Sequence, residues 1–385
     1  MARVLILGAC PQSLLHIRGH LIRRVVDEGH QLLIVGDRPT PEVLDALKSW
    51  GAHHLTMAID NEEIDSARDL KILRQLQNLM AKAQPDIFVS YAIKPLVYGL
   101  LAAWIADVPV RYGLINDLGS TLGTKADTKQ YLLQKVASML YRISPGLTES
   151  AAFDNRDDAL LFCARRLVGG PEEIALINGS GVDLCDFQPT PFPDVITFLM
   201  ATDLRRPGHV GDYLEAARRL RRRHPSLRIQ LANLADEDSS TPDSQKVKSW
   251  ENNRAIEYIG EISDIKTAIT DSSVLVMPPS RTEIRRPVLE AMAMGRPIIT
   301  TDTCGRPQTL NPGENGFLVP PQDPAALSQA MTHFIGEPDM VRSMGARSRY
   351  LAEQRFDIEQ VTDSLLGIFE LGARRIPPPL PSDVA

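Results

Sequence analysis

The strongest constraint on the fold is a repeated alternation of short apolar runs with longer segments of helical periodicity. It begins with "RVLILG", "LLHIRGHLIRRVVDEG" and "QLLIVG", and continues through "DIFVSY" and "VRYGLI". Short aliphatic runs joined by helices predict right-handed βαβ units and a parallel sheet that is covered on both faces. The first half of the chain is therefore expected to be doubly wound.

The alternation restarts after "INGSGVDLCDFQPTPFPD" with "VITFLMATD", "VGDYLEAARRLRRRHP" and "LRIQLAN". The proline-rich residues 188–193 exclude regular strand pairing and are expected to form a linker. We predict an α/β chain with two doubly wound, Rossmann-like domains that face a cleft, over residues 1–188 and 189–356. A helix over 357–375 and a disordered tail over 376–385 are expected to follow.

Composition narrows the class of partner and the compartment. The net charge of −6 argues against nucleic acid, because a surface that tracks phosphates usually makes a domain basic. The four cysteines show no metal-ligand spacing, so neither a metal site nor a disulfide framework is expected. The longest apolar stretch, residues 95–110, is shorter than the ~20 residues that cross a bilayer. A cytoplasmic protein is expected.

A glutamate near the start of a predicted helix is the first candidate for a binding residue. Pro287 suits the first turn of a helix, which places Glu290 in that turn, beyond the end of the strand "VLVMPP". In doubly wound sheets ligands bind at this edge, and a carboxylate there can accept two hydrogen bonds from a ribose. The plain alternative is a glutamate that interacts only with the helix dipole.

The order and spacing of many motifs resemble glycosyltransferase family 4. In the second half these include "IEYIGEISDI" and "VLVMPPSRTEIRRPVLEAMAMGRPIITTD"; in the first half they include "HIRGHLIRRVVDEGHQLLIVG" and "YGLINDLGS". The resemblance covers about residues 3–372 and implies retaining enzymes of the GT-B architecture. It is closest to the subgroup that acts on polyprenyl-diphosphate-linked saccharides at the bacterial inner membrane. It also implies that the C-terminal helix returns to the first domain.

The resemblance assigns roles to particular positions. It implies that Glu290 holds the donor ribose, that Glu283 lies near the transferred sugar and that Gly260 passes close to the base. Gly8, at the loop "GACPQS", is expected on the donor side. The residues expected to face the acceptor are Arg18, Asn116, Asp117 and Ser120.

The donor-phosphate motif departs from the family pattern. Asp203 and Gly208 occupy the places where the family has an Arg and a Lys, and six residues instead of seven separate Glu283 from Glu290. Losing two charge-assisted hydrogen bonds would cost roughly 3 to 6 kcal/mol. Arginine suits bidentate phosphate contact, so nearby arginines are expected to replace the missing Arg and Lys at the donor diphosphate. The alternative is that these arginines form only a solvated basic turn. The four arginines are Arg205, Arg206, Arg285 and Arg286.

Two segments raise the question of a membrane surface. The basic run "RRLRRRHP", residues 218–225, either favours the dipole at a helix C-terminus or contacts anionic lipid. Residues 129–143 have apolar side chains at helical spacing and are expected to form a buried helix. The alternative is that this helix lies on the surface of a bilayer. The expected location is therefore the cytoplasm, with peripheral binding to the inner face of the cell membrane as the alternative.

The sequence indicates three candidate functions. The first is a transferase that moves a sugar from a nucleotide-diphosphate donor to a lipid-linked saccharide acceptor in polysaccharide or glycan assembly. This reaction is expected to need no metal ion. The second is a catalytically impaired member of the fold that scaffolds or activates a partner glycosyltransferase. The third is a nucleotide-sugar epimerase, which would release nucleotide without an acceptor.

Overall fold

A computed structural model of the chain describes most of its residues, in two compact units that are treated separately. The described residues are 1–8, 10–58, 66–91, 93–115, 148–164, 174–202, 204, 210–234, 255–262, 264–277, 286–301 and 309–372. Unit 1 comprises Met1–Ser180 and Glu359–Ala385, and unit 2 comprises Gly181–Ile358. Both are parallel sheets with helices, so the predicted α/β class with two doubly wound sheets is confirmed.

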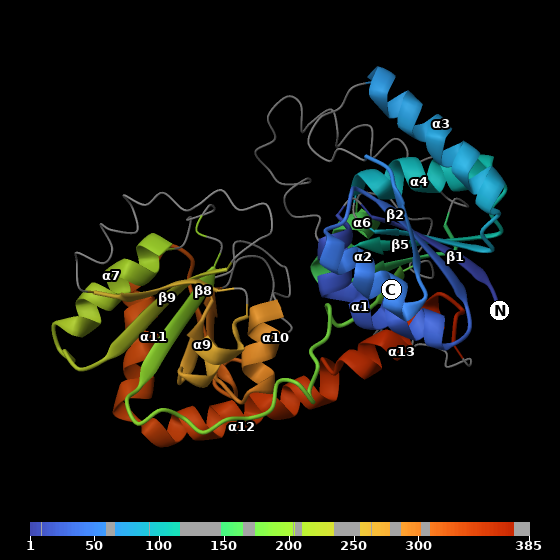
Figure 1. Ribbon diagram of the computed structural model, residues 1–385. Coiled ribbons are helices and arrows are strands. Elements are labelled where there is room, and N and C mark those ends of the chain that lie inside the picture. Colours follow the sequence, from blue (N-terminus) through green and yellow to red (C-terminus); the bar gives the residue numbers. More distant parts are fainter. Residues whose placement is uncertain are drawn as a thin grey trace. The chain divides into compact units, whose positions relative to one another are not determined.

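Unit 1 contains one parallel sheet whose strands have the order β3-β2-β1-β4-β5-β6-β7 (Figure 1). Its strands are β1 (Arg3–Gly8), β2 (Gln31–Gly36), β3 (His53–Thr56), β4 (Ile87–Tyr91), β5 (Val110–Ile115), β6 (Ser150–Phe153) and β7 (Ile174–Leu176). Its helices are α1 (Pro11–Asp27), α2 (Pro41–Trp50), α3 (Ser66–Ala83), α4 (Ile93–Ile105), α6 (Arg156–Ala164) and α13 (Ile358–Ile368).

Each strand of the unit 1 sheet feeds two cores because successive side chains point to opposite faces. In β1, Val4 and Ile6 pack in one cluster with buried residues of α1, α2 and α13. Leu5 and Leu7 pack in the other cluster, with α3, α4 and α6. A central parallel strand is buried on both faces, which explains why "VLIL" is apolar without alternation.

The last helix completes the first of these cores. Phe369, just beyond α13, packs its ring 5.1 Å from that of Tyr112 in β5. Arg24 of α1 forms ion pairs with Glu359 at 2.9 Å and with Asp363 at 3.2 Å. Residues from the C-terminal end of the chain thus belong to the unit that begins at its N-terminus.

Unit 2 contains a second parallel sheet, with the order β10-β9-β8-β11-β12-β13. Its strands are β8 (Thr197–Thr202), β9 (Arg228–Leu234), β10 (Glu257–Ile262), β11 (Val274–Val276), β12 (Ile298–Thr301) and β13 (Gly316–Val319). Its helices are α7 (Val210–Arg221), α9 (Lys266–Thr270), α10 (Arg286–Ala293), α11 (Pro324–Gly336) and α12 (Pro338–Arg355).

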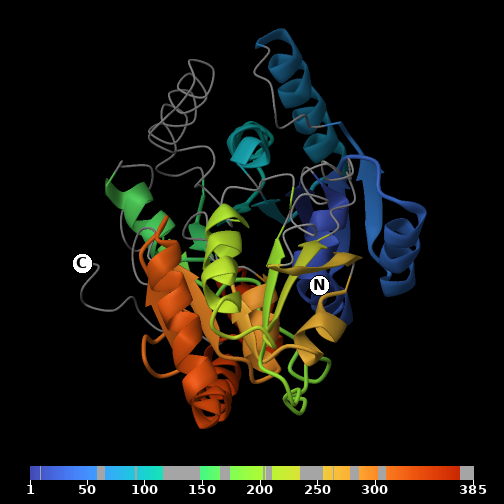
Figure 2. The same cartoon turned by 90° about the vertical axis from the view of Figure 1, so that its left-hand side faces the viewer.

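The unit 2 sheet also separates two cores. Phe198 and Met200 of β8 pack with α7 and α11, whereas Leu199 and Ala201 pack with α9 and α10. Figures 1 and 2 show α7 and α11 side by side on one face of the sheet. Two covered faces around a parallel sheet leave only the strand ends and their loops for a binding site.

The chain passes between the units at Ser180–Gly181 and again at Ile358–Glu359. Next to the boundary, Val182 donates its N–H to the carbonyl of Phe356 at 2.7 Å and accepts from the N–H of Ile358 at 3.0 Å. The two crossing segments are therefore hydrogen-bonded to each other within unit 2.

The first crossing lies eight residues before the predicted domain boundary at 188, because the proline-rich segment is anchored within unit 2. Arg296 is fully buried and donates to the carbonyls of Thr190 and Pro191 at 2.9 and 3.1 Å. Its guanidinium also lies 4.6 Å from the ring of Phe192. Burial lowers the pKa of Arg296 to about 10, which leaves it charged near neutral pH. Residues 188–193 are consequently held to unit 2 by Arg296, although Gln188, Pro189 and Pro191 are themselves exposed.

Candidate active site

The strand order of unit 2 marks the region in which a ligand of a doubly wound sheet binds. The order reverses between β8 and β11, and in such sheets the crevice beyond the carboxyl ends of these strands receives the ligand. Helix α10 is the first helix described after β11, and it carries Glu290. The predicted ribose-binding carboxylate therefore lies on the helix that follows the reversal point.

Glu290 is a buried carboxylate in a short ion pair. It is 5% exposed, and Oε1 accepts a hydrogen bond from Nε of Arg286, one turn earlier, at 2.6 Å. Burial raises the pKa of Glu290, Arg286 opposes this effect, and the charges of Asp264 and Asp186 add to the rise. Arg286 thus compensates part of the cost of burying a carboxylate that a ligand could use.

The position of Glu290 within α10 differs from the prediction. The helix begins at Arg286, and its first turn contains no acidic residue. Glu290 therefore begins the second turn, because the chain enters the helix one residue before Pro287. Contact with Arg286 at i,i+4 follows from this register.

Acidic and basic residues near Glu290 were missed by the sequence reasoning. Lys266, the first residue of α9, forms an ion pair with Asp186 at 2.6 Å, and Asp264 caps the backbone N–H of Lys266 at 2.9 Å. Asp186 and Asp264 are near enough to Glu290 to raise its pKa. The run "GEISD", which begins within β10, was the available signal for Asp264, whereas Asp186 lies about 100 residues before Glu290 in the chain.

Gly260 adopts a conformation that only glycine takes readily. It has φ of +95° in β10, where the register with β9 shifts between Tyr258 and Glu261. A Cβ built at Gly260 meets no described atom within 4 Å, so the backbone geometry and not crowding requires glycine. The open space beside this bulge is compatible with the predicted approach of a base.

Gly8 ends β1 at the corresponding reversal point of unit 1, paired with Tyr91 of β4. A Cβ at Gly8 would make only ordinary contacts, the nearest being 3.6 Å from the Tyr91 ring. A Cβ at Gly36, by contrast, would lie 2.3 Å from the carbonyl oxygen of Gly8. Gly36, which the sequence reasoning passed over, is the glycine that allows β1 and β2 to end close together.

Arg18, predicted on the acceptor side, is only 2% exposed. Its backbone is non-helical, with φ of −126°, and kinks α1. Nη2 donates to Oδ1 of Asp154 at 2.5 Å, and Nη1 donates to the carbonyl of Gly179 at 3.0 Å. Burial raises the pKa of Asp154, and the charge of Arg18 opposes this rise. All of the described bonds of Arg18 are internal to unit 1.

The remaining predicted site residues lie outside the described part of the chain. They are Glu283, Arg205, Arg206, Arg285, Asn116, Asp117 and Ser120, together with Asp203, Gly208 and the predicted tail 376–385. Of the predicted donor-side residues, the structure places Glu290 and Arg286 in contact, Gly260 within β10 and Gly8 at the end of β1.

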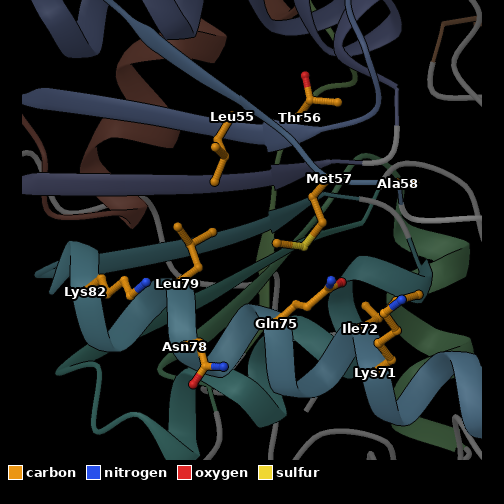
Figure 3. A pocket seen from close by; sticks show the side chains of 10 residues that line it. All are labelled: Leu55, Thr56, Met57, Ala58, Lys71, Ile72, Gln75, Asn78, Leu79 and Lys82. Carbon is orange, nitrogen blue, oxygen red and sulfur yellow. The ribbon is translucent and has the colours of Figure 1, made fainter.

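A pocket of about 610 Å³ lies in unit 1 at the carboxyl end of β3 (Figure 3). Its lining residues are Leu55, Thr56, Met57, Ala58, Lys71, Ile72, Gln75, Asn78, Leu79 and Lys82. Figure 3 shows Lys71 and Lys82 at opposite ends of the α3 segment, with Gln75 and Asn78 between them. Three turns of helix separate the two lysines, about 16 Å. The pocket therefore combines an apolar floor with cationic ends.

The described residues contain neither a metal centre nor a membrane-spanning helix. They contain no group of three or more His, Cys, Asp or Glu side chains arranged to hold a metal ion. None of the helices with described residues is both long and apolar enough to cross a membrane.

Two doubly wound units, one with a buried carboxylate beside its reversal point, define a protein of the GT-B class. The profile of the glycosyl transferases group 1 family matches residues 195–337. The putative glycosyltransferase EpsD of Bacillus subtilis is 30% identical over 322 residues, covering 78% of this chain and 81% of EpsD. The chain belongs to this family of glycosyltransferases, as the sequence predicted.

Other relatives cover almost the whole chain. One is the N,N'-diacetylbacillosaminyl-diphospho-undecaprenol alpha-1,3-N-acetylgalactosaminyltransferase of Campylobacter jejuni, 22% identical, with 96% of this chain and 98% of that protein covered. Among solved structures, Anabaena Alr3699/HepE in complex with UDP has a TM-score of 0.74 and 15% identity, covering 96% of this chain and all of that chain. A glycosyltransferase of Rickettsia africae has a TM-score of 0.75 at 17% identity, with 96% and 98% covered. These likenesses establish the GT-B fold.

Proposed function

We propose that the protein transfers a sugar, with retention, from a nucleoside-diphosphate donor to a lipid-linked saccharide in bacterial polysaccharide assembly. The observation that carries the proposal is Glu290, buried on the helix that follows the reversal point of unit 2 in a chain of the glycosyltransferase family. The diphospho-undecaprenol substrate in the name of the Campylobacter relative supports the acceptor class. The UDP in the Anabaena structure supports the donor class.

The donor side follows from the chemistry of the placed residues. Glu290 accepts hydrogen bonds from the two ribose hydroxyls, and the bulge at Gly260 lies beside the base. Arg286 lies one turn from Glu290, where its guanidinium can turn towards the diphosphate. The proposal adds Arg205, Arg206 and Arg285 as further phosphate contacts and Gly8 on the donor side, with Glu283 beside the transferred sugar. The charge of the leaving diphosphate is then stabilised by cationic side chains.

The acceptor side is proposed to lie in unit 1. The pocket at the end of β3 offers lysine charge at both ends and an apolar floor, features that match an anionic amphiphile such as a lipid-linked diphosphate. Asn116, Asp117 and Ser120 are proposed acceptor contacts. Because the guanidinium of Arg18 is bound by Asp154 and Gly179, we assign Arg18 to holding the segments at these two residues against α1. Such an acceptor would bring the protein to the inner face of the cell membrane.

A radiolabelled transfer assay tests this function. Membrane extracts that supply lipid-linked saccharides are incubated with the protein and a panel of UDP- and GDP-sugars. The proposal expects label in the lipid fraction with one donor and no transfer by the Glu290→Ala variant. Retention is read from the anomeric configuration of the product by NMR, and an inverted product refutes that part of the proposal.

The replacement of the family's phosphate-binding Arg and Lys by Asp203 and Gly208 favours a second candidate. In it, the protein is a catalytically impaired relative that activates a partner glycosyltransferase. A thermal-shift panel of nucleotide sugars separates the two: stabilisation by one donor supports the transferase, and no shift with any donor supports the partner-activating role.

A further inference from the structure

Four exposed arginines lie at the C-terminal end of α7 and in the turn that follows it. We call Arg218, Arg219, Arg222 and Arg223 the arginine face. Arg218 and Arg222, and likewise Arg219 and Arg223, are four residues apart, the spacing at which side chains of a continuing helix lie one above the other. The turn is hydrogen-bonded to the helix, since the N–H groups of Arg223 and His224 donate to the carbonyl of Leu220 at 2.9 Å.

The charge of the arginine face is only partly compensated. Glu215 contacts Arg219 at 3.1 Å and Arg218 at 3.6 Å, and the two guanidinium-bearing side chains remain 46% and 44% exposed. The side chains of Arg222 and Arg223 form no ion pair or hydrogen bond with any residue in the described part of the chain. Within the part of the chain that the structure describes, these four arginines thus face one contacting carboxylate, on a protein whose net charge is −6.

The arginine face lies far from the proposed donor site. Helix α7 runs back between the parallel strands β8 and β9, so its C-terminus lies at the amino edge of the sheet. Nε of Arg221 accordingly donates to the carbonyl of Ala255, just before β10 begins. The twelve residues of α7 separate this edge from the carboxyl edge by about 18 Å. Donor phosphates therefore do not account for these arginines.

The composition of the face indicates what it binds. No large hydrophobic side chain on α7 is among the exposed ones of the described residues, whereas a stable protein interface is centred on apolar and aromatic anchors. A diffuse array of guanidinium groups suits an extended anionic surface. We propose that the arginine face docks unit 2 on an anionic lipid bilayer. This inference does not depend on the transfer reaction.

Vesicle binding of the full-length protein tests the proposal. Affinity is measured by co-sedimentation with vesicles of phosphatidylcholine containing phosphatidylglycerol, and with vesicles of phosphatidylcholine alone. Each arginine near an anionic surface contributes about fivefold in affinity, so the Arg222→Gln/Arg223→Gln variant is expected to bind about thirty-fold more weakly. The matched control is Arg342→Gln/Arg355→Gln, which removes equal charge from exposed positions of α12.

The expected pattern is preference for the anionic vesicles, loss in the α7 variant and near-normal binding in the α12 control. Equal binding to both vesicle types, equal loss in both variants, or unchanged binding of the α7 variant overturns the proposal. Unchanged binding would leave the arginines to an acidic protein partner. Thermal unfolding and UDP binding of both variants verify that they are folded. Transfer to a detergent-solubilised acceptor then reports on the proposed function independently of docking.

Discussion

At the scale of single residues, a ligand that binds Glu290 has to bind a carboxylate that is already hydrogen-bonded to Arg286. The carboxylate is buried and one of its oxygens already accepts a short hydrogen bond from Arg286. A ribose diol would occupy the remaining acceptor positions of the carboxylate, while the guanidinium holds it in place. Binding would thereby satisfy a buried charge that, among the described residues, Arg286 compensates in the free protein.

Replacing Glu290 by Gln should weaken UDP binding by about 10- to 100-fold, because hydrogen bonds to a charged group contribute about 1.5 to 3 kcal/mol. Isothermal calorimetry with UDP and GDP measures the change. Glu353→Gln is the matched control, since Glu353 forms an i,i+4 pair with Arg349 of the same 2.6 Å length on α12. Unchanged nucleotide affinity in Glu290→Gln would refute the ribose assignment.

The raised pKa of Glu290 predicts a pH-dependent cost to stability. Because folding raises this pKa above its ordinary value of 4.5, the folded state binds the proton more tightly than the unfolded state. The contribution of Glu290 to stability is therefore most favourable below 4.5 and falls as the pH rises through its folded pKa. Glu290→Gln should gain stability relative to the wild type over that interval. Urea unfolding of both proteins across a pH series measures it, and parallel curves would contradict the prediction.

Some of these residues could be found from the sequence and others could not. Gly8 ends an apolar strand segment, and Glu290 lies on the first helix described after another, so both positions are local properties of the sequence. The Arg286 contact follows from i,i+4 spacing once the helix start is known. Asp154 lies 136 residues from Arg18, and no local pattern indicates that pairing. Long-range partners of this kind become visible only when the sheet order is known.

At the scale of elements, helix α12 packs close to the residues that follow α10, and the close contact is made by two glycines, Gly345 and Gly295. A Cβ at Gly345 would lie 2.1 Å from the carbonyl oxygen of Gly295, which is closer than nonbonded atoms can approach. Gly345 therefore fixes how near these segments pack, although glycine inside a helix is itself unfavourable.

Gly345→Ala should destabilise the protein by about 1 to 3 kcal/mol, the usual cost of overpacking, despite the better helix propensity of alanine. Gly211→Ala is the control in α7, where a Cβ meets no described atom within 4 Å and propensity should stabilise by up to about 1 kcal/mol. Thermal or urea unfolding compares the two. The same sign for both variants would show that crowding at Gly345 is relieved by movement of α12.

The pocket at the end of β3 gives an element-scale prediction about the acceptor. Lys71→Gln/Lys82→Gln should raise the KM for a lipid-linked acceptor severalfold and leave UDP affinity unchanged, because both lysines belong to unit 1. The control is Lys48→Gln, on α2, which does not line the pocket. A change confined to kcat, or a matching effect of the control, would place the acceptor elsewhere.

The alternation of strands and helices was predictable from the sequence, while the boundary between the units was not. Strands buried on both faces are apolar throughout, and this is a strong local signal. The boundary depends on Arg296, which binds the proline-rich segment from more than a hundred residues away. A segment that composition marks as a linker is thus recruited into unit 2 by a buried guanidinium.

At the scale of the whole molecule, the core of unit 1 contains residues from both ends of the chain, including Leu365 of α13. Leu365→Ala should remove about 2 to 5 kcal/mol of stability from unit 1. Hydrogen exchange should then show lost protection in β1 and β2 with β8 and β9 unaffected. Leu220→Ala, buried in the α7 core, should give the reverse pattern. Loss across both sheets in either variant would show a single cooperative unit.

The return of α13 to unit 1 has a consequence for biosynthesis. Unit 2 is continuous in sequence, from Gly181 to Ile358, so all of its core residues are available before synthesis ends. Unit 1 needs Val361, Leu365 and Phe369, which are synthesised after all of unit 2. Domains commonly fold in the order of their synthesis. Here the unit that is begun first is completed second, so its N-terminal apolar strands are expected to stay exposed on the nascent chain until α13 has emerged.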